Sequence, residues 1–218
     1  QDDAFIEKMV AKYPKLLANL PSKDSGVRYR LEGYLFPATY NYGKDTTVKE
    51  MIDQMIAAMD QNLRRYYETL ESKNINVNEV LTLASLVEKE GATDQDRKDI
   101  ASVFYNRLNQ DMPLQSNIAI LYAEGKLGQK TTLKEDATID TELDSPYNIY
   151  KNTGLMPGPV DNPGVSAIEA AVNPSKTDYL YFVANVENGE VFFAKTYEEH
   201  NKNVEEHVNS KLTQVSSN

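Results

Sequence analysis

Two glutamates at the end of one helix-like segment are the strongest candidates for chemistry. On a helical wheel of residues 76–90, Glu90 falls in the middle of the apolar stripe and Glu88 points away from it. Burial and the partial negative charge of a helix C-terminus both raise the pKa of a carboxyl group. A raised pKa suits a general acid, so Glu90 is predicted to donate a proton. The alternative is a core glutamate paired with Arg97 or Arg107.

Glu32 is a second carboxylate in a chemically suggestive context. It lies among the aromatic residues Tyr34, Phe36, Tyr40 and Tyr42, and carbohydrate sites commonly combine aromatic platforms with acids. A glycosidase with two catalytic carboxylates holds them about 5 to 9.5 Å apart, a separation that only the fold decides. The alternative is an exposed turn glutamate beside core aromatics.

Neutral hydrogen-bonding side chains gather in a region that Gly and Pro punctuate, residues 111–174. Such a long, rigidified segment is typical of surfaces that carry sites. Together these side chains suit a ligand rich in hydroxyl and amide groups, although an Asn-Pro-Gly sequence is first of all a turn. They are Gln115, Ser116, Asn117, Tyr147, Asn148, Tyr150 and Asn162.

Metal, thiol and nucleotide chemistry find no support in the sequence. His200 and His207 lie seven residues apart among glutamates, which favours a solvated helix face over a metal site. The chain has no cysteine, which excludes disulfides, thiolate catalysis and Cys-based zinc sites. No P-loop or dinucleotide-binding fingerprint occurs. We therefore expect no metal and no cofactor.

Composition is that of an ordinary globular protein and argues against several partners. The 218 residues are 40% hydrophobic and carry a formal net charge of -10 at pH 7, without any Lys/Arg cluster of five or more. This charge disfavours nucleic acid and anionic membrane surfaces as partners. The longest apolar stretch, residues 81–87, is far short of the roughly 20 residues that a bilayer span requires, so the chain is expected to be soluble.

The elements that would position these side chains are mostly helices. An α+β fold is predicted, in which a helical region carries Glu90 and a small antiparallel sheet contains a C-terminal hairpin followed by a terminal helix. Asn188-Gly189 between two apolar runs is the hairpin signal. The predicted helices span residues 4–20, 47–72, 76–90, 93–108, 118–124 and about 196–211.

Several short motifs occur in an order that resembles a known family. The set is similar to the YceG-like (MltG) endolytic murein transglycosylases over about residues 30 to 207. The motifs are LEGYLFP at 31–37, ASLVEKE at 84–90, ASVFYNRL at 101–108, LQS at 114–116, YNIY at 147–150, GLMPGP at 154–159 and YLYFV at 179–183. The sequence departs from the common pattern at Asn117, where many relatives have Asp, and at Gly91, which replaces a Thr or Ser.

The resemblance implies a single-pass envelope enzyme at the extracytoplasmic face of the plasma membrane. Its substrate would be nascent peptidoglycan glycan strands, and penicillin-binding proteins or other elongasome components are its candidate protein partners. Membrane contact would come only through an N-terminal anchor upstream of this chain. We therefore expect residues 1–30 to be a stub and linker from an upstream anchor and LysM-like region, and residues 31–218 to be the catalytic domain.

The resemblance also maps the family's catalytic glutamate onto Glu90. The implied reaction cleaves the bond between N-acetylmuramic acid and N-acetylglucosamine and leaves a 1,6-anhydro end, so one carboxyl suffices. The alternatives are a hydrolytic muramidase helped by Glu32, and a non-catalytic peptidoglycan-binding or divisome scaffold module. The expected substrate-binding residues are Glu32, Tyr34, Glu88, Arg107, Gln115, Ser116, Asn117, Tyr147, Asn148, Tyr150 and Asn162.

Overall fold

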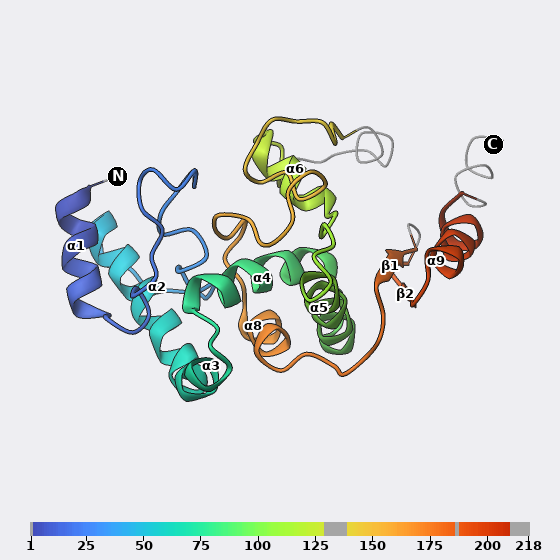
Figure 1. Cartoon of the computed structure of the whole chain (residues 1–218). Coiled ribbons are helices and arrows are strands. Elements are labelled where there is room, and N and C mark those ends of the chain that lie inside the picture. The colour runs from blue at the N-terminus through green and yellow to red at the C-terminus, as the bar shows by residue number, and fades with distance from the viewer. Residues whose placement is uncertain (1, 129–138, 186–187, 210–218) are drawn as a thin grey trace.

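The helix that ends at Glu90 lies at the centre of the molecule. This helix, α4 (Val77–Glu90), packs against α5 (Asp94–Leu108) and α8 (Val165–Val172), as Figure 1 shows. Every residue from 80 to 87 is buried, as expected for a helix covered on all sides. The computed structural model describes residues 2–128, 139–185 and 188–209.

The N-terminal part of the chain packs into the same core. It contains α1 (Asp3–Lys12), α2 (Val48–Leu63), a short 3₁₀ turn (Arg64–Tyr66) and α3 (Tyr67–Lys73). Met9, Leu16 and Leu17 are buried in one apolar cluster with residues of α2 and α4. The division of the chain at residue 30 stays a prediction.

Two predicted helices end earlier than the sequence pattern indicates. The helix predicted for residues 4–20 stops at Lys12 and continues as turns, because Pro14 disfavours helical geometry at Tyr13. The helix predicted for 47–72 is split by the 3₁₀ turn into α2 and α3. The helix starts are correct: capping boxes begin α2 at Thr47 and α4 at Asn76.

Within the described residues, the region that the sequence predicts to be irregular holds α6 (Asn117–Ala123) and one helix that the pattern misses. That helix is α8, whose eight residues are mostly small and apolar and whose N-cap is Gly164, without a side-chain cap. A window so short shows little helical periodicity, although the helix contacts both α4 and α5.

The chain closes with the predicted hairpin and helix, so the α+β class is confirmed. Strands β1 (Tyr181–Ala184) and β2 (Val191–Ala194) pair antiparallel, with Phe182 opposite Phe193. Helix α9 (Tyr197–Val204) follows, and a π-helical turn continues it over Glu205–Asn209. Residues 210 and 211 of the predicted terminal helix lie outside the described residues.

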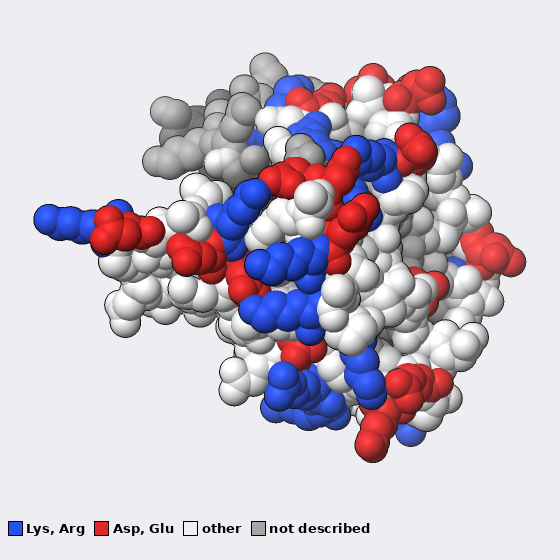
Figure 2. Space-filling view, turned by 90° about the vertical axis from the view of Figure 1, so that its left-hand side faces the viewer, with Lys and Arg blue, Asp and Glu red and all other residues white. Residues whose placement is uncertain are grey.

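Acidic and basic side chains are mixed on the face that carries α1 and α2. Figure 2 shows Lys and Arg beside Asp and Glu there, and several of these residues form ion pairs, including Lys12 with Asp53. This face therefore offers no continuous positive surface to a phosphate backbone. None of the helices in the described ranges is both long and apolar enough to span a lipid bilayer.

Candidate active site

Glu90 lies at the last position of α4 with its carboxyl group against α6. The hydroxyl of Ser116, the N-cap residue of α6, donates a hydrogen bond of 2.7 Å to Glu90 Oε1. Burial raises the pKa of Glu90, and the Ser116 hydrogen bond lowers it by a smaller amount. The net upward shift favours the neutral acid, which is the form that can donate a proton.

Glu88 points to a different part of the molecule. It forms an ion pair of 3.4 Å with Arg97 and accepts a 2.9 Å hydrogen bond from the backbone N–H of Gly164. Arg97 is one of the two arginines that could have neutralised Glu90 as a core residue. Within the described ranges neither Arg97 nor Arg107 forms an ion pair with Glu90, which leaves the Glu90 carboxyl without a compensating cation.

Arg107 is buried and fixes the loop that leads to Ser116. Its Nη1 donates to the carbonyl oxygens of Pro113 and Leu114 at 2.9 and 3.1 Å and to Gln115 Oε1 at 3.1 Å. Its Nε donates to the carbonyl oxygen of Leu180 at 2.6 Å. A guanidinium carries five N–H donors, so one side chain joins this loop and the start of the hairpin to α5.

A cleft of about 480 Å³ opens beside Glu90. One part of its wall comes from the segment between α5 and α6 and from Tyr150, whose hydroxyl donates to the Asn117 side chain. The other part comes from the hairpin and α9. The predicted residues that line the cleft are Glu90, Arg107, Gln115, Asn117 and Tyr150, with Ser116 bonded to Glu90 behind them.

Other predicted site residues serve the interior of the fold. Asn148 is fully buried: its amide donates to two carbonyl oxygens of its own loop at 2.8 and 3.0 Å, and its Oδ1 accepts from the N–H of Tyr150 at 3.0 Å. Tyr147 is buried with its ring 4.8 Å from that of Tyr122. Tyr34 is buried too. None of these three side chains lines the Glu90 cleft.

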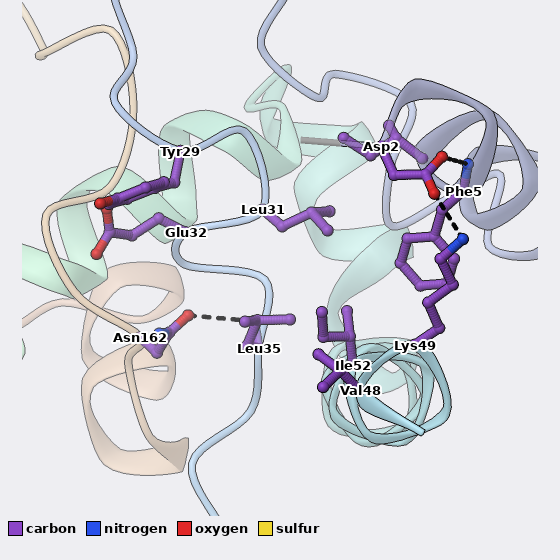
Figure 3. A pocket seen from close by; sticks show the side chains of 11 residues that line it. Asp2, Phe5, Tyr29, Leu31, Glu32, Leu35, Val48, Lys49, Ile52 and Asn162 are labelled. Atoms are coloured by element: carbon purple, nitrogen blue, oxygen red, sulfur yellow. Dashed lines mark hydrogen bonds and ion pairs between the residues drawn. The ribbon is translucent and has the colours of Figure 1, made fainter. Parts of the chain in front are cut away.

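Glu32 lies in a separate cavity of about 490 Å³ between α1, α2 and the loop around residues 29–35 (Figure 3). The walls are mostly apolar, with Phe5, Leu35 and Ile52 among them. The Tyr122 hydroxyl donates to the Glu32 carboxylate, and burial raises the pKa of Glu32. Glu32 and Glu90 therefore do not share a cavity.

Asn162 belongs to the Glu32 cavity and stabilises its loop. Its Oδ1 accepts hydrogen bonds from the backbone N–H groups of Gly33 at 2.8 Å and Leu35 at 3.2 Å, and the second of these is drawn in Figure 3. The Asn-Pro-Gly turn thus holds a loop more than a hundred residues away in the sequence. The side chain that sequence reasoning assigned to the ligand holds the protein's own backbone.

His200 lines the Glu90 cleft, a position that the prediction of a solvated helix face did not include. It is half-buried, and its ring stacks on Tyr181 at 5.3 Å, whereas His207 stacks on Phe192. The α-helix gives way to a π-helical turn at residue 205, so the seven-residue spacing does not keep the two histidines equivalent. The signal that could have found His200 is Tyr197, three residues earlier and also in the cleft wall.

A carboxyl with a raised pKa beside hydroxyl, amide and aromatic side chains is the arrangement of an acid–base site for a polar, uncharged ligand. The family model described as "YceG-like family" matches residues 3–206. The chain therefore belongs to the YceG-like family.

Named relatives and a solved structure are similar to nearly the whole chain. The "Endolytic murein transglycosylase" of Streptococcus pneumoniae is 66% identical over 212 residues, which cover 97% of this chain and 38% of that protein. The protein of the same name from Bacillus subtilis is 45% identical over 211 residues, covering 96% of this chain and 57% of its own length. The crystal structure of a putative yceG-like protein from Listeria monocytogenes has 46% sequence identity and a TM-score of 0.81, covering 92% of this chain and 64% of that one.

Proposed function

We propose that this chain is the catalytic domain of an endolytic lytic transglycosylase that cleaves peptidoglycan glycan strands. The observation that carries the proposal is the Glu90 carboxyl group, whose pKa burial raises and which lies beside a cleft with amide, hydroxyl and aromatic side chains. The names of the relatives from S. pneumoniae and B. subtilis support the same reaction. Because the chain spans 38% and 57% of those proteins, the activity of the whole protein is part of the proposal.

Glu90 acts first as an acid and then as a base. Its proton moves to the oxygen of the bond between N-acetylmuramic acid and N-acetylglucosamine, and that bond breaks through an oxocarbenium-like state. The resulting carboxylate then takes the proton of the muramic acid C6 hydroxyl, whose oxygen bonds to C1 of the same sugar. The products are a 1,6-anhydro end and a free N-acetylglucosamine hydroxyl, no water is consumed, and Glu90 is protonated again.

The neighbouring side chains contribute in two ways. Ser116 donates to Glu90 in either protonation state and stabilises the carboxylate that forms when the proton leaves. Gln115, Asn117 and Tyr150 line the cleft and offer hydrogen bonds to sugar hydroxyl and amide groups. Arg107 positions this loop through its bonds to backbone carbonyls, so its part in binding is indirect.

The proposal includes a place in the cell and a domain organisation. An enzyme that acts on peptidoglycan works in the cell envelope, where an anchor upstream of residues 1–30 would hold residues 31–218 near the outer face of the plasma membrane. Components of the cell-wall synthesis machinery, penicillin-binding proteins among them, are the partners that a strand-cutting enzyme would meet there.

Mass spectrometry of uncrosslinked glycan strands tests the reaction. The strands are incubated with the parent chain and with Glu90→Gln, and circular dichroism verifies that both chains are folded. Internal fragments with 1,6-anhydro ends from the parent, and none from the variant, are the expected result. Reducing ends would indicate a hydrolytic muramidase, and intact strands with both chains would favour a non-catalytic binding module.

A further inference from the structure

His200 comes from a distant part of the sequence yet shares the cleft with Glu90. Its ring is the last of three stacked groups, which are the Arg107 guanidinium of α5, the Tyr181 ring of β1 and the His200 imidazole of α9. The Arg107 guanidinium lies 5.1 Å from the ring centroid of Tyr181, and the His200 ring lies 5.3 Å from the same ring at an interplanar angle of 24°. Arg107 is in turn bonded to the loop that carries Ser116, so the imidazole is held in a defined position relative to the Glu90 side of the cleft.

The surroundings of the ring hold it neutral. Burial lowers the pKa of His200, and the positive charge of Arg107 lowers it further. Nδ1 is buried and has no hydrogen-bond partner among the described residues. A proton on Nδ1 would be a buried unsatisfied donor, so the favoured tautomer carries its hydrogen on Nε2, the nitrogen that stays available to a ligand.

We propose that His200 is a substrate-binding residue of the Glu90 cleft, donating a hydrogen bond from Nε2 to a hydroxyl or N-acetyl oxygen of the glycan strand. This inference rests on the proposed transglycosylase function, whose substrate it helps to orient. The Tyr181 ring beneath the imidazole fixes the plane of the donor, and Tyr197 extends the aromatic wall. An uncharged donor on an aromatic support fits an uncharged sugar.

The role predicts a specific pattern among variants of the active chain. His200→Phe keeps a ring that can stack on Tyr181 but removes the donor, so KM for glycan strands is expected to rise about three- to tenfold with little change in kcat. His200→Gln keeps an N–H donor at a similar reach and is expected to recover part of the loss. His207→Phe is the matched control, because His207 stacks on Phe192 outside the cleft and its substitution should leave both constants unchanged.

Strand binding in the Glu90→Gln background separates this inference from the proposed function. Binding of uncrosslinked glycan strands to Glu90→Gln alone, weakened about three- to tenfold when His200→Phe is added, supports the role of His200. Equal affinity of the single and double variants, with both folded by circular dichroism, would overturn it. Cleavage by the parent chain tests the proposed function independently of that result. If Glu90→Gln binds no strands at all, the role of His200 is overturned, whereas the proposed function is overturned only if the parent chain also leaves the strands intact.

Discussion

The Glu90 cleft and the Glu32 cavity contain the same kind of acid in opposite surroundings. In each, burial raises the pKa of the carboxyl, and one hydroxyl donates to it: Ser116 to Glu90 and Tyr122 to Glu32. The Glu90 cleft has amide, hydroxyl and imidazole groups in its wall, whereas the Glu32 cavity is mostly apolar. A perturbed carboxyl therefore does not define a sugar site by itself, and the side chains around it decide what it can act on.

The causes of the two pKa shifts differ as well. The pKa of Glu32 is raised by burial and by the nearby charge of Asp161, and it is lowered by Tyr122 and by the charge of Arg28. The pKa of Glu90 reflects burial and the Ser116 hydrogen bond, with no charged neighbour contributing. Burial is thus the largest cause of both shifts, and the pKa of Glu32 differs in responding also to the charges of Asp161 and Arg28.

The largest expected difference between the two sites is in the rate of glycan cleavage when each glutamate is replaced by glutamine. Glu90→Gln should lower the rate of glycan cleavage roughly 10²- to 10⁴-fold, because the amide cannot donate a proton to the leaving oxygen. Glu32→Gln should change the rate by less than about threefold, since its cavity is separate from the cleft. Product release measured by chromatography with both chains at equal concentration compares them. A comparable loss in the Glu32 variant would mean that the two cavities act together.

A smaller difference is expected in the free energy of unfolding when the side chain that holds the loop of each site is removed: Arg107 at the Glu90 cleft and Asn162 at the Glu32 cavity. Arg107→Met removes a charged donor from the carbonyls of Pro113, Leu114 and Leu180, and should cost at least about 3 kcal/mol in free energy of unfolding. Asn162→Ala leaves two backbone N–H groups without their acceptor and should cost about 1–2 kcal/mol. Urea unfolding followed by circular dichroism measures both. Equal costs would show that the two regions are equally dependent on a single polar side chain.

The pH dependence of kcat/KM should change when the Ser116 hydroxyl is removed and stay the same when the Tyr122 hydroxyl is removed. The Ser116 hydrogen bond lowers the pKa of Glu90, so Ser116→Ala raises that pKa further. Because the reaction needs protonated Glu90, the alkaline limb of kcat/KM should move to higher pH in this variant. Tyr122→Phe changes only the surroundings of Glu32 and should leave that limb in place. An alkaline limb that Ser116→Ala does not move would mean that another group controls it.

The smallest expected effect is a gain in stability. A folded-state pKa above the unfolded value means that the stability from neutral Glu90 is fully present below the unfolded pKa and is lost as pH rises through the folded pKa. Glu90→Gln removes this loss, so its melting temperature should match that of the parent near pH 4 and exceed it above neutral pH, by about 2–4 °C for each kcal/mol recovered. Calorimetry at both pH values is the test, and a gain of equal size at pH 4 would contradict this explanation.

Local signals predicted the local parts of the molecule. Thr47, Asn76 and Thr93 begin helices because each is followed three residues later by an acidic side chain that completes a capping box. Asn188-Gly189 lies in the connection of the hairpin. The helical wheel separated Glu90 from Glu88, whose partners in the structure do differ. Each of these depends on spacing within a few residues, which a sequence displays directly.

The parts that sequence could not predict depend on contacts between distant residues. Ser116 meets Glu90 across 26 positions, and Tyr122 meets Glu32 across 90. Asn148 has the residue type of a ligand-binding side chain, and only the path of its loop shows that it is fully buried. The glutamates beside His200 in the sequence favour a solvated helix face, and only the tertiary fold brings its ring against Tyr181 of the hairpin.

The order in which the walls of the cleft occur along the chain has a consequence for its synthesis. The buried residues of the core cluster extend no further than Val172 in the described part of the sequence, while the hairpin and α9 follow at 181–204. A chain that emerges N-terminus first can therefore bury its core, with Glu90 in place, before the residues of the second wall have emerged. At a synthesis rate of about 5–20 residues per second, we expect a lag of a few seconds between formation of the core and completion of the substrate-binding cleft.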